Sequence, residues 1–109
     1  MVIGHKIREK VEINKFLEQI QEYTEKDIET TNHAFFHFSE EQRKVYDELF
    51  LKNILFNEIP IFVGIQHNRL WALFYRYKKE ILKMIIDIQI DKIYIVTFYI
   101  IDETQIPRI

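Results

Sequence analysis

The sequence contains no cysteine, only two glycines and two prolines, and no apolar run long enough to cross a bilayer. The absence of cysteine excludes a disulfide framework and thiolate chemistry, and it is typical of proteins in a reducing cytosol. The longest apolar stretches, such as Ile93 to Ile101, are far shorter than the ~20 residues that a membrane helix needs. The opening residues Met1 to Lys6 carry no apolar segment of a secretory signal. We therefore expect a cytoplasmic protein that has no membrane partner.

What the chain does contain is typical of one folded domain. Its 109 residues are 48% hydrophobic and 29% charged, a balance found in globular proteins. A domain of this length buries about 60–70% of the surface that its unfolded chain exposes, which is enough for one core. The frequent isoleucine, lysine and glutamate are typical of a thermophile or of an AT-rich genome. We predict a single domain over residues 1–109.

The charges are distributed unevenly along the chain. The formal net charge is −2, which argues against a protein whose whole surface attracts nucleic acid. Most of the acidic residues lie between Glu12 and Glu58, whereas the predicted strand region carries the basic residues Arg69, Arg76, Lys78, Lys79, Lys83 and Lys92. One locally basic face is therefore compatible with a nearly neutral protein.

The N-terminal half has helical periodicity. Apolar residues between Glu12 and Tyr23 recur at the spacing of one helical stripe. Polar residues follow, and Thr30, Thr31 or Asn32 is a candidate N-cap for a short helix through Phe38. The stretch from Ser39 to Gln42 has the spacing of a capping box, which predicts a further helix that ends before Pro60.

Beyond Pro60 the apolar period changes to two, which indicates strands. The predicted strands are Ile61 to Ile65, Leu70 to Tyr77, Ile81 to Ile88 and Ile93 to Ile101. If Tyr77 pairs with Leu82, the Trp71 side of the sheet forms the core layer, and Arg76, Lys83 and Asp87 share the opposite face. The fold class predicted is α+β, with N-terminal helices packed on a four-stranded antiparallel sheet.

A resemblance supports the same fold class. The segments Phe16 to Ile20 and Tyr23 to Thr31, then His33, then four strands closing on Ile95 to Tyr99 resemble a group of small bacterial and archaeal proteins. These proteins are similar to RelE-type toxins, whose barnase-like nuclease fold packs helices on a curved antiparallel sheet. The resemblance implies an RNA partner, metal-independent endoribonuclease activity and an antitoxin as protein partner.

The resemblance also implies a set of site residues. In that group a histidine opens a short helix and arginines follow four and eight residues later. Here His33 matches the histidine, whereas His37 and Glu41 occupy the two arginine positions and Arg43 lies nearby. His33 would then be the acid or base, and Arg43 a phosphate ligand.

Residue chemistry adds further candidates. His33 and His37 lie four apart, so on one helix they share a face and can act as general base and acid near neutral pH. Arg76 and Lys83 can bind phosphate, and Tyr99 can stack on a base or transfer a proton. The structural alternative is that the histidines are partly buried among aromatic residues and that the basic residues are solvated.

Two other functions are compatible with the same residues. A non-catalytic module could bind a protein partner, or a second copy of itself, through its aromatic sheet, and 15% aromatic content favours a homodimer. A zinc site at His33 and His37 with Glu40 or Glu41 is a third possibility. Because no cysteine or third histidine is near in sequence, we expect no metal and no cofactor.

Overall fold

The computed structural model describes residues 6–31, 34–35 and 39–107. Its helices and strands are β1 (Ile7–Lys10), α1 (Ile13–Ile20), β2 (Ile28–Thr30), α2 (Glu40–Val45), α3 (Glu48–Asn57), β3 (Phe62–Gln66), β4 (Trp71–Tyr77), β5 (Glu80–Ile88) and β6 (Ile93–Ile101). Short turns of 3-10 helix cover Glu25–Asp27 and Glu103–Gln105. Strands therefore alternate with helices in the first half of the chain, and the four strands after Pro60 form close to their predicted bounds.

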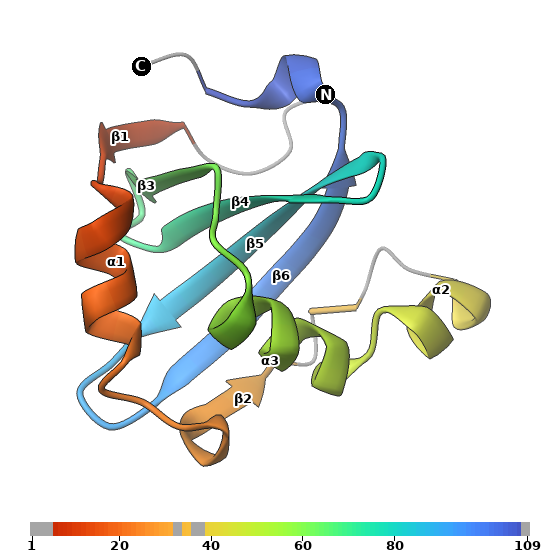
Figure 1. The fold of residues 1–109 in the computed structure, drawn as a ribbon, viewed down its shortest axis with the longest axis horizontal. Helices are drawn as coiled ribbons and strands as arrows, with labels where there is room; N and C mark the ends of the chain where they lie inside the picture. The colour runs from red at the N-terminus through yellow and green to blue at the C-terminus, as the bar shows by residue number, and fades with distance from the viewer. Residues whose placement is uncertain (1–5, 32–33, 36–38, 108–109) are drawn as a thin grey trace.

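The described strands join one six-stranded mixed sheet, in the order β1-β3-β4-β5-β6-β2 (Figure 1). β2 runs parallel to β6, with Ile28 opposite Ile93, and the other pairings are antiparallel. The predicted fold class, N-terminal helices on a four-stranded antiparallel sheet, is therefore wrong. The sheet has two more strands than predicted, one of them precedes every helix, and one of them is parallel to its neighbour.

The two strands that the sequence did not reveal are both short edge strands. β1 has four residues and β2 has three, which is too few for a period-two pattern to stand out. Both also carry exposed charged residues, such as Arg8 and Glu29, and such residues protect sheet edges from further pairing. In a sequence, these segments therefore look like polar connections.

The helices α2 and α3 begin at local capping signals. The capping box of Ser39 and Gln42 is present and starts α2, as predicted. The helical region then divides, because Asp47 accepts a hydrogen bond from the backbone N–H of Phe50 at 2.9 Å and caps a separate helix, α3. The helix expected through Phe38 falls largely outside the described residues. None of the described helices is long and apolar enough to cross a membrane.

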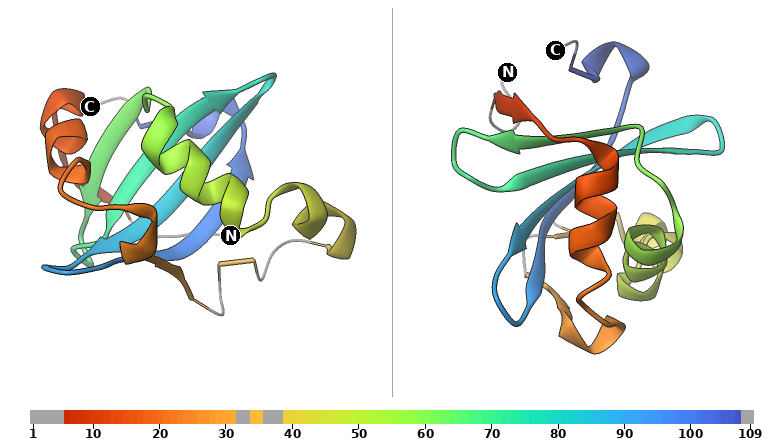
Figure 2. Two further views of the ribbon diagram at one scale, coloured as in Figure 1. Left: turned by 60° about the horizontal axis from the view of Figure 1, so that its bottom comes forward. Right: turned by 60° about the vertical axis from the view of Figure 1, so that its left-hand side comes forward.

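The main core lies between the sheet and the helices α1 and α3, which cover the same side of the sheet (Figure 2). We call this side the helix face. Phe16 of α1 and Leu51 of α3 are fully buried there against Leu73 and Leu82 of the sheet. Trp71, expected in the core, is partly buried at its margin, with its ring centroid 6.0 Å from that of Phe16. The aromatic side chains on this face are therefore largely used for packing.

The opposite side of the sheet, which we call the outer face, has a second, smaller core. Its buried members are Phe62, Ala72, Phe74, Ile81 and Ile85. Ile7 of β1 and Ile106 of the C-terminal segment pack against it. Gly64 permits this approach, because a Cβ atom there would lie 2.7 Å from Cγ2 of Ile7. The outer face is thus partly covered rather than an open, flat sheet.

The register between β4 and β5 differs from the expected one but preserves the faces. Tyr77 pairs with Glu80, whereas the sequence suggested Leu82, two residues further on. Because side chains alternate with a period of two, a shift of two residues leaves each of them on the same side. Arg76 and Lys83 accordingly share the outer face, as predicted.

Candidate ligand-binding site on the outer face

The structure divides the predicted site residues between the two sides of the sheet. Lys83 and Tyr99 are directly opposite each other on β5 and β6, and Arg76 lies on the same outer face. Arg43 belongs to α2 on the other side of the sheet. The predicted catalytic residues His33 and His37 lie outside the described residues. The predicted site residues that the structure describes therefore form two separate groups. Lys83, Tyr99 and Arg76 lie on the outer face, and Arg43 lies apart from them on α2.

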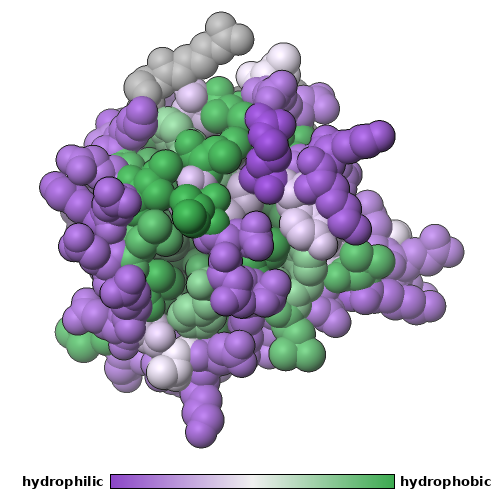
Figure 3. Space-filling model, viewed as in Figure 1, coloured by the Kyte–Doolittle hydropathy of each residue, from purple (hydrophilic) through white to green (hydrophobic). Residues whose placement is uncertain are grey.

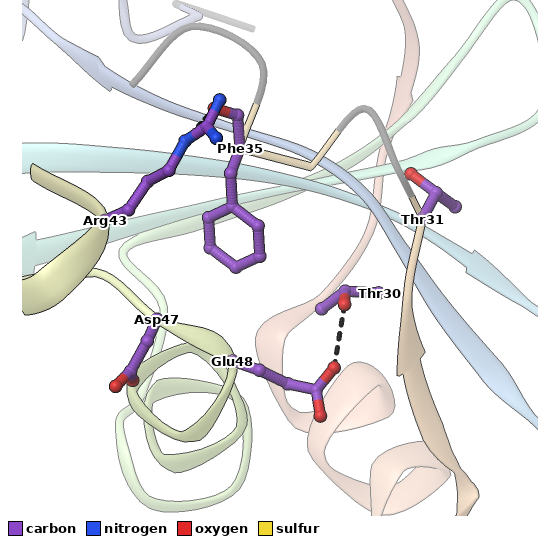
Figure 4. Close-up of a pocket in the computed structure, with 6 residues that line it drawn as sticks. All are labelled: Thr30, Thr31, Phe35, Arg43, Asp47 and Glu48. Atoms are coloured by element: carbon purple, nitrogen blue, oxygen red, sulfur yellow. Dashed lines mark hydrogen bonds between the residues drawn. The ribbon is translucent and has the colours of Figure 1, made fainter. Parts of the chain in front are cut away.

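Arg43 lines a cavity of about 330 Å³ between β2 and the two short helices α2 and α3 (Figure 4). Its Nε and Nη2 atoms donate hydrogen bonds to the backbone carbonyl of Phe35, at 3.2 and 2.9 Å. The cavity is also lined by two carboxylates, those of Asp47 and Glu48. A cavity with two carboxylates, whose one guanidinium already donates to a backbone carbonyl, is a poor environment for phosphate.

The carboxylate of Glu48 has structural partners of its own. Its Oε2 accepts a hydrogen bond from the hydroxyl of Thr30 at 2.7 Å, which ties α3 to β2 (Figure 4). Its Oε1 lies 3.4 Å from Nζ of Lys52, one helical turn further along α3. The polar contacts around this cavity therefore mainly connect the helices to the edge of the sheet.

Lys83 has a different environment on the outer face. Its Nζ lies 5.6 Å from the ring centroid of Phe74 and 6.0 Å from that of Tyr99, within the range of cation–π attraction. The side chain is partly buried, and this burial lowers the pKa of Lys83. Among the described residues it has no carboxylate partner within ion-pair distance. A desolvated ammonium without a counter-charge is a site at which an anion would be stabilised.

Arg76 is the second cation of the outer face. It follows Phe74 by two positions on β4, and Phe74 pairs directly with Lys83, so the two cations are diagonal neighbours. The Arg76 guanidinium forms an ion pair with Glu103 of the C-terminal 3-10 turn. Both partners are exposed, so the pair contributes little to stability and can be exchanged for another anion.

Tyr99 lines two cavities on the outer face. One, of about 160 Å³, is also lined by Lys83 and Gln105. The other, of about 310 Å³, is lined by Gln66, Thr97 and further residues. The phenol ring therefore contributes to a cationic cavity and to a neutral polar one.

Gln66 and Gln105 line these cavities, although neither was predicted from the sequence as a site residue. Gln66 shares the outer face of β3 with Phe62 and Gly64 at alternate positions, but it follows the predicted strand Ile61 to Ile65, so its burial was not evident from the sequence. Gln105 comes after the sheet, in a segment whose path cannot be read from periodicity. Its place beside Lys83 depends on how the C-terminal segment folds back.

Neither the expectation of no metal nor the alternative of a zinc site at His33 and His37 is tested by the described residues. In the part of the chain that the structure describes, no three histidine or acidic side chains are grouped so that they could hold a metal ion. The pair His33 and His37, from which the zinc alternative was drawn, lies outside that part.

Comparisons with family models, curated proteins and solved structures found no match for this chain. The resemblance to RelE-type toxins therefore stays a prediction. Among the described residues, Lys83 and Tyr99 combine a partly buried cation with an aromatic ring.

Proposed function

We propose that this protein binds single-stranded RNA on the outer face of its sheet. Lys83 binds a phosphate of the RNA, and Tyr99 provides an aromatic face on which a base stacks. The observation that carries the proposal is the partly buried ammonium of Lys83, 6.0 Å from the Tyr99 ring centroid, with no carboxylate partner in the described chain.

The energetics of Lys83 favour an anionic ligand. Burial disfavours the charged form of this lysine, which is why its pKa is lowered. A phosphate oxygen beside Nζ would supply the missing counter-charge, and binding would raise the pKa of Lys83 again. The surrounding rings partly exclude water from Nζ of Lys83. The attraction between Nζ and a phosphate is therefore stronger here than at an exposed lysine.

The neighbouring groups fit a polynucleotide better than an isolated anion. A base can stack on a tyrosine ring, which is worth ~1–3 kcal/mol per base and tolerates any sequence. Arg76 offers a second phosphate position if the phosphate replaces Glu103 as partner of the guanidinium. Arg76, Lys83 and Tyr99 lie on one face of the sheet. There the two cations would bind successive phosphates of an extended RNA strand, and the ring would stack on a base.

The proposal concerns binding, and cleavage is a separate hypothesis. Metal-independent cleavage was predicted to use His33, His37 and Tyr99, and only Tyr99 lies in the described residues. Incubating the RNA with the protein in EDTA tests cleavage directly. If His33 is the acid or base, His33→Ala should slow cleavage by roughly 10²–10⁴-fold and leave binding nearly unchanged.

Fluorescence anisotropy with labelled single-stranded RNA, measured between about 50 and 200 mM salt, tests the binding proposal. Lys83→Met keeps the apolar stem and removes the charge, so it should weaken binding and flatten the salt dependence by about 0.7 in slope. Tyr99→Leu should reduce affinity by about 5- to 150-fold. Lys15→Met makes the same charge change at an exposed position of α1 and should alter neither the affinity nor the salt dependence.

Two results would contradict the proposal. One is the absence of RNA binding at the lowest salt concentration. The other is equal weakening by Lys83→Met and Lys15→Met, because it would indicate a general charge effect rather than a site.

A protein interface is the second candidate function, and one observation favours it. Val45 at the end of α2 and Leu49 at the start of α3 are 60% and 73% exposed. Figure 3 shows apolar side chains protruding from this part of the molecule and gathered over the segment between α3 and β3. An interface would therefore use the helices, since the sheet aromatics Phe74 and Tyr75 are buried. A homodimer formed in this way should dissociate in sedimentation experiments when Leu49→Glu is introduced.

A further inference from the structure

The larger cavity beside Tyr99 combines polar groups with apolar walls. Gln66 and Asn68, at the end of β3 and in the following turn, line it together with Thr97 of β6. Its apolar lining comes from Leu70, Ile85 and Val96. At about 310 Å³ it lies at the lower end of the range found for small-ligand sites.

Gln66 has a polar group with no partner in the part of the chain that the structure describes. The residue is 1% exposed, and its Nε2 atom has no hydrogen-bond partner among the described residues. Nearly all buried polar groups are hydrogen-bonded, so an unpaired one in a cavity wall calls for an explanation. The two ends of a carboxamide can exchange by rotation, which lets the side chain present either a donor or an acceptor to the cavity.

The chemistry of the residues that line this cavity restricts the kind of ligand that it can bind. Apolar side chains and the Tyr99 ring suit a flat group with apolar faces, whereas the carboxamide and the Thr97 hydroxyl suit a polar edge with donors and acceptors. A nucleobase has both properties, and glutamine pairs with base edges through adjacent N–H and C=O groups. Asn68 is less available, because its Oδ1 accepts a hydrogen bond from the N–H of Leu70 at 3.1 Å.

We infer that this cavity receives one nucleobase of the bound RNA and that Gln66 and Thr97 hydrogen-bond to its edge. The inference rests on the proposed function, since Lys83, which lines the other cavity beside Tyr99, would hold the phosphate. Thr97 and Tyr99 are two residues apart on β6, which corresponds to about 6–7 Å. A base and its neighbouring phosphate can therefore occupy the two cavities that Tyr99 lines.

The test uses two labelled oligoribonucleotides that differ at one position. One carries a base at its central nucleotide, and the other has an abasic ribose there and an unchanged phosphate backbone. The wild-type protein should bind the first more tightly. Gln66→Leu should reduce the affinity for the first by about 5- to 150-fold, leave the affinity for the second unchanged, and keep the salt slope.

Stability measurements separate a ligand-binding role of Gln66 from a structural one. If the amide is unpaired in the free protein, Gln66→Leu should raise the melting temperature while it weakens base binding. A lower melting temperature with equal loss of affinity for both oligonucleotides would overturn the inference. Thr97→Val, which removes the second hydrogen-bonding group at nearly constant volume, should reproduce the selective loss.

The outcomes distinguish this inference from the proposed function. Equal binding of the two oligonucleotides, with a salt slope that still depends on Lys83, would overturn the base pocket and leave the RNA site. If no RNA binds, titration with free adenosine and uridine decides the matter. A shift of the Gln66 side-chain amide resonance in NMR spectra would then support a nucleoside pocket, and its absence would overturn the inference.

Discussion

Replacing Tyr75 with phenylalanine should make the protein more stable. Tyr75 is 1% exposed on β4, and its hydroxyl has no hydrogen-bond partner among the described residues. The ring packs in the main core on the helix face, and phenylalanine would preserve that packing. Burying an unpaired polar group costs ~1–3 kcal/mol, and the substitution removes this cost.

We expect the free energy of unfolding to increase by about 1 kcal/mol. This is the lower end of the range, because losing the oxygen atom also removes some packing contacts and leaves a small gap. For a domain of about 100 residues, such a change raises the melting temperature by about 4 °C. Urea denaturation should show a higher midpoint and an unchanged slope.

Tyr46→Phe is the matched control for this experiment. The Tyr46 hydroxyl donates a hydrogen bond to Oε1 of Glu80 at 2.8 Å, so the same atom is removed from a hydroxyl that has a partner. The control should destabilise the protein by about 1.5 kcal/mol, as is typical of hydrogen bonds to charged groups. Opposite signs for Tyr75→Phe and Tyr46→Phe are therefore the expected result.

The pH dependence provides a second check on Tyr75. Burial, with a smaller contribution from the negative charge of Glu58, raises the pKa of Tyr75 far above its ordinary value of 10.0. The tyrosine stays neutral in the folded protein while it ionises in the unfolded chain, so stability is lost as the pH rises above 10.0. The advantage of Tyr75→Phe should grow in this range. A variant no more stable than the wild type at pH 7, or an advantage that does not grow, would refute the reasoning.

Three further predictions concern a close backbone approach, a helix cap and the buried lysine. Gly64→Ala should cost ~1–3 kcal/mol in urea denaturation, because its Cβ would lie 2.7 Å from Ile7 Cγ2; an unchanged midpoint would contradict this packing. Asp47→Ala should cost about 1 kcal/mol by removing the α3 cap, whereas Asp47→Asn should cost less. Lys83→Met should stabilise the free protein at pH 7, because burial lowers the pKa of Lys83 below 10.5. This gain should shrink as the pH rises toward 10.5 and the amine becomes neutral in both states; a pH-independent difference would argue against it.

The part of the fold that could be predicted is the part governed by side-chain alternation. From Phe62 to Ile101 the strands are long, apolar and β-branched, so their positions and faces were evident. The edge strands β1 and β2 were missed, because three or four residues with charged side chains carry no periodic signal. Pairing of β2 with β6 joins residues 28 and 93, a contact that local sequence does not encode.

The same limit applies to the candidate site. Alternation predicted that Arg76 and Lys83 share a face, and strand pairing then placed Tyr99 beside Lys83. It could not predict that Glu103 pairs with Arg76, because that contact depends on the fold of the C-terminal segment. It also could not separate Arg43 from this group, since the orientation of a helix relative to a sheet is set by tertiary packing.

Two buried groups without a hydrogen-bond partner among the described residues, the Tyr75 hydroxyl and the Gln66 amide nitrogen, have different explanations. Both should lower stability, so Tyr75→Phe and Gln66→Leu should both stabilise the free protein. Tyr75 packs in the main core beneath the helices. Gln66 lines a cavity of about 310 Å³, where a bound group can supply the missing hydrogen bond. Suppose that both variants are more stable than the wild type and that only Gln66→Leu loses affinity for a base. The stability that the protein loses by burying the unpaired Gln66 amide is then explained by its role in ligand binding.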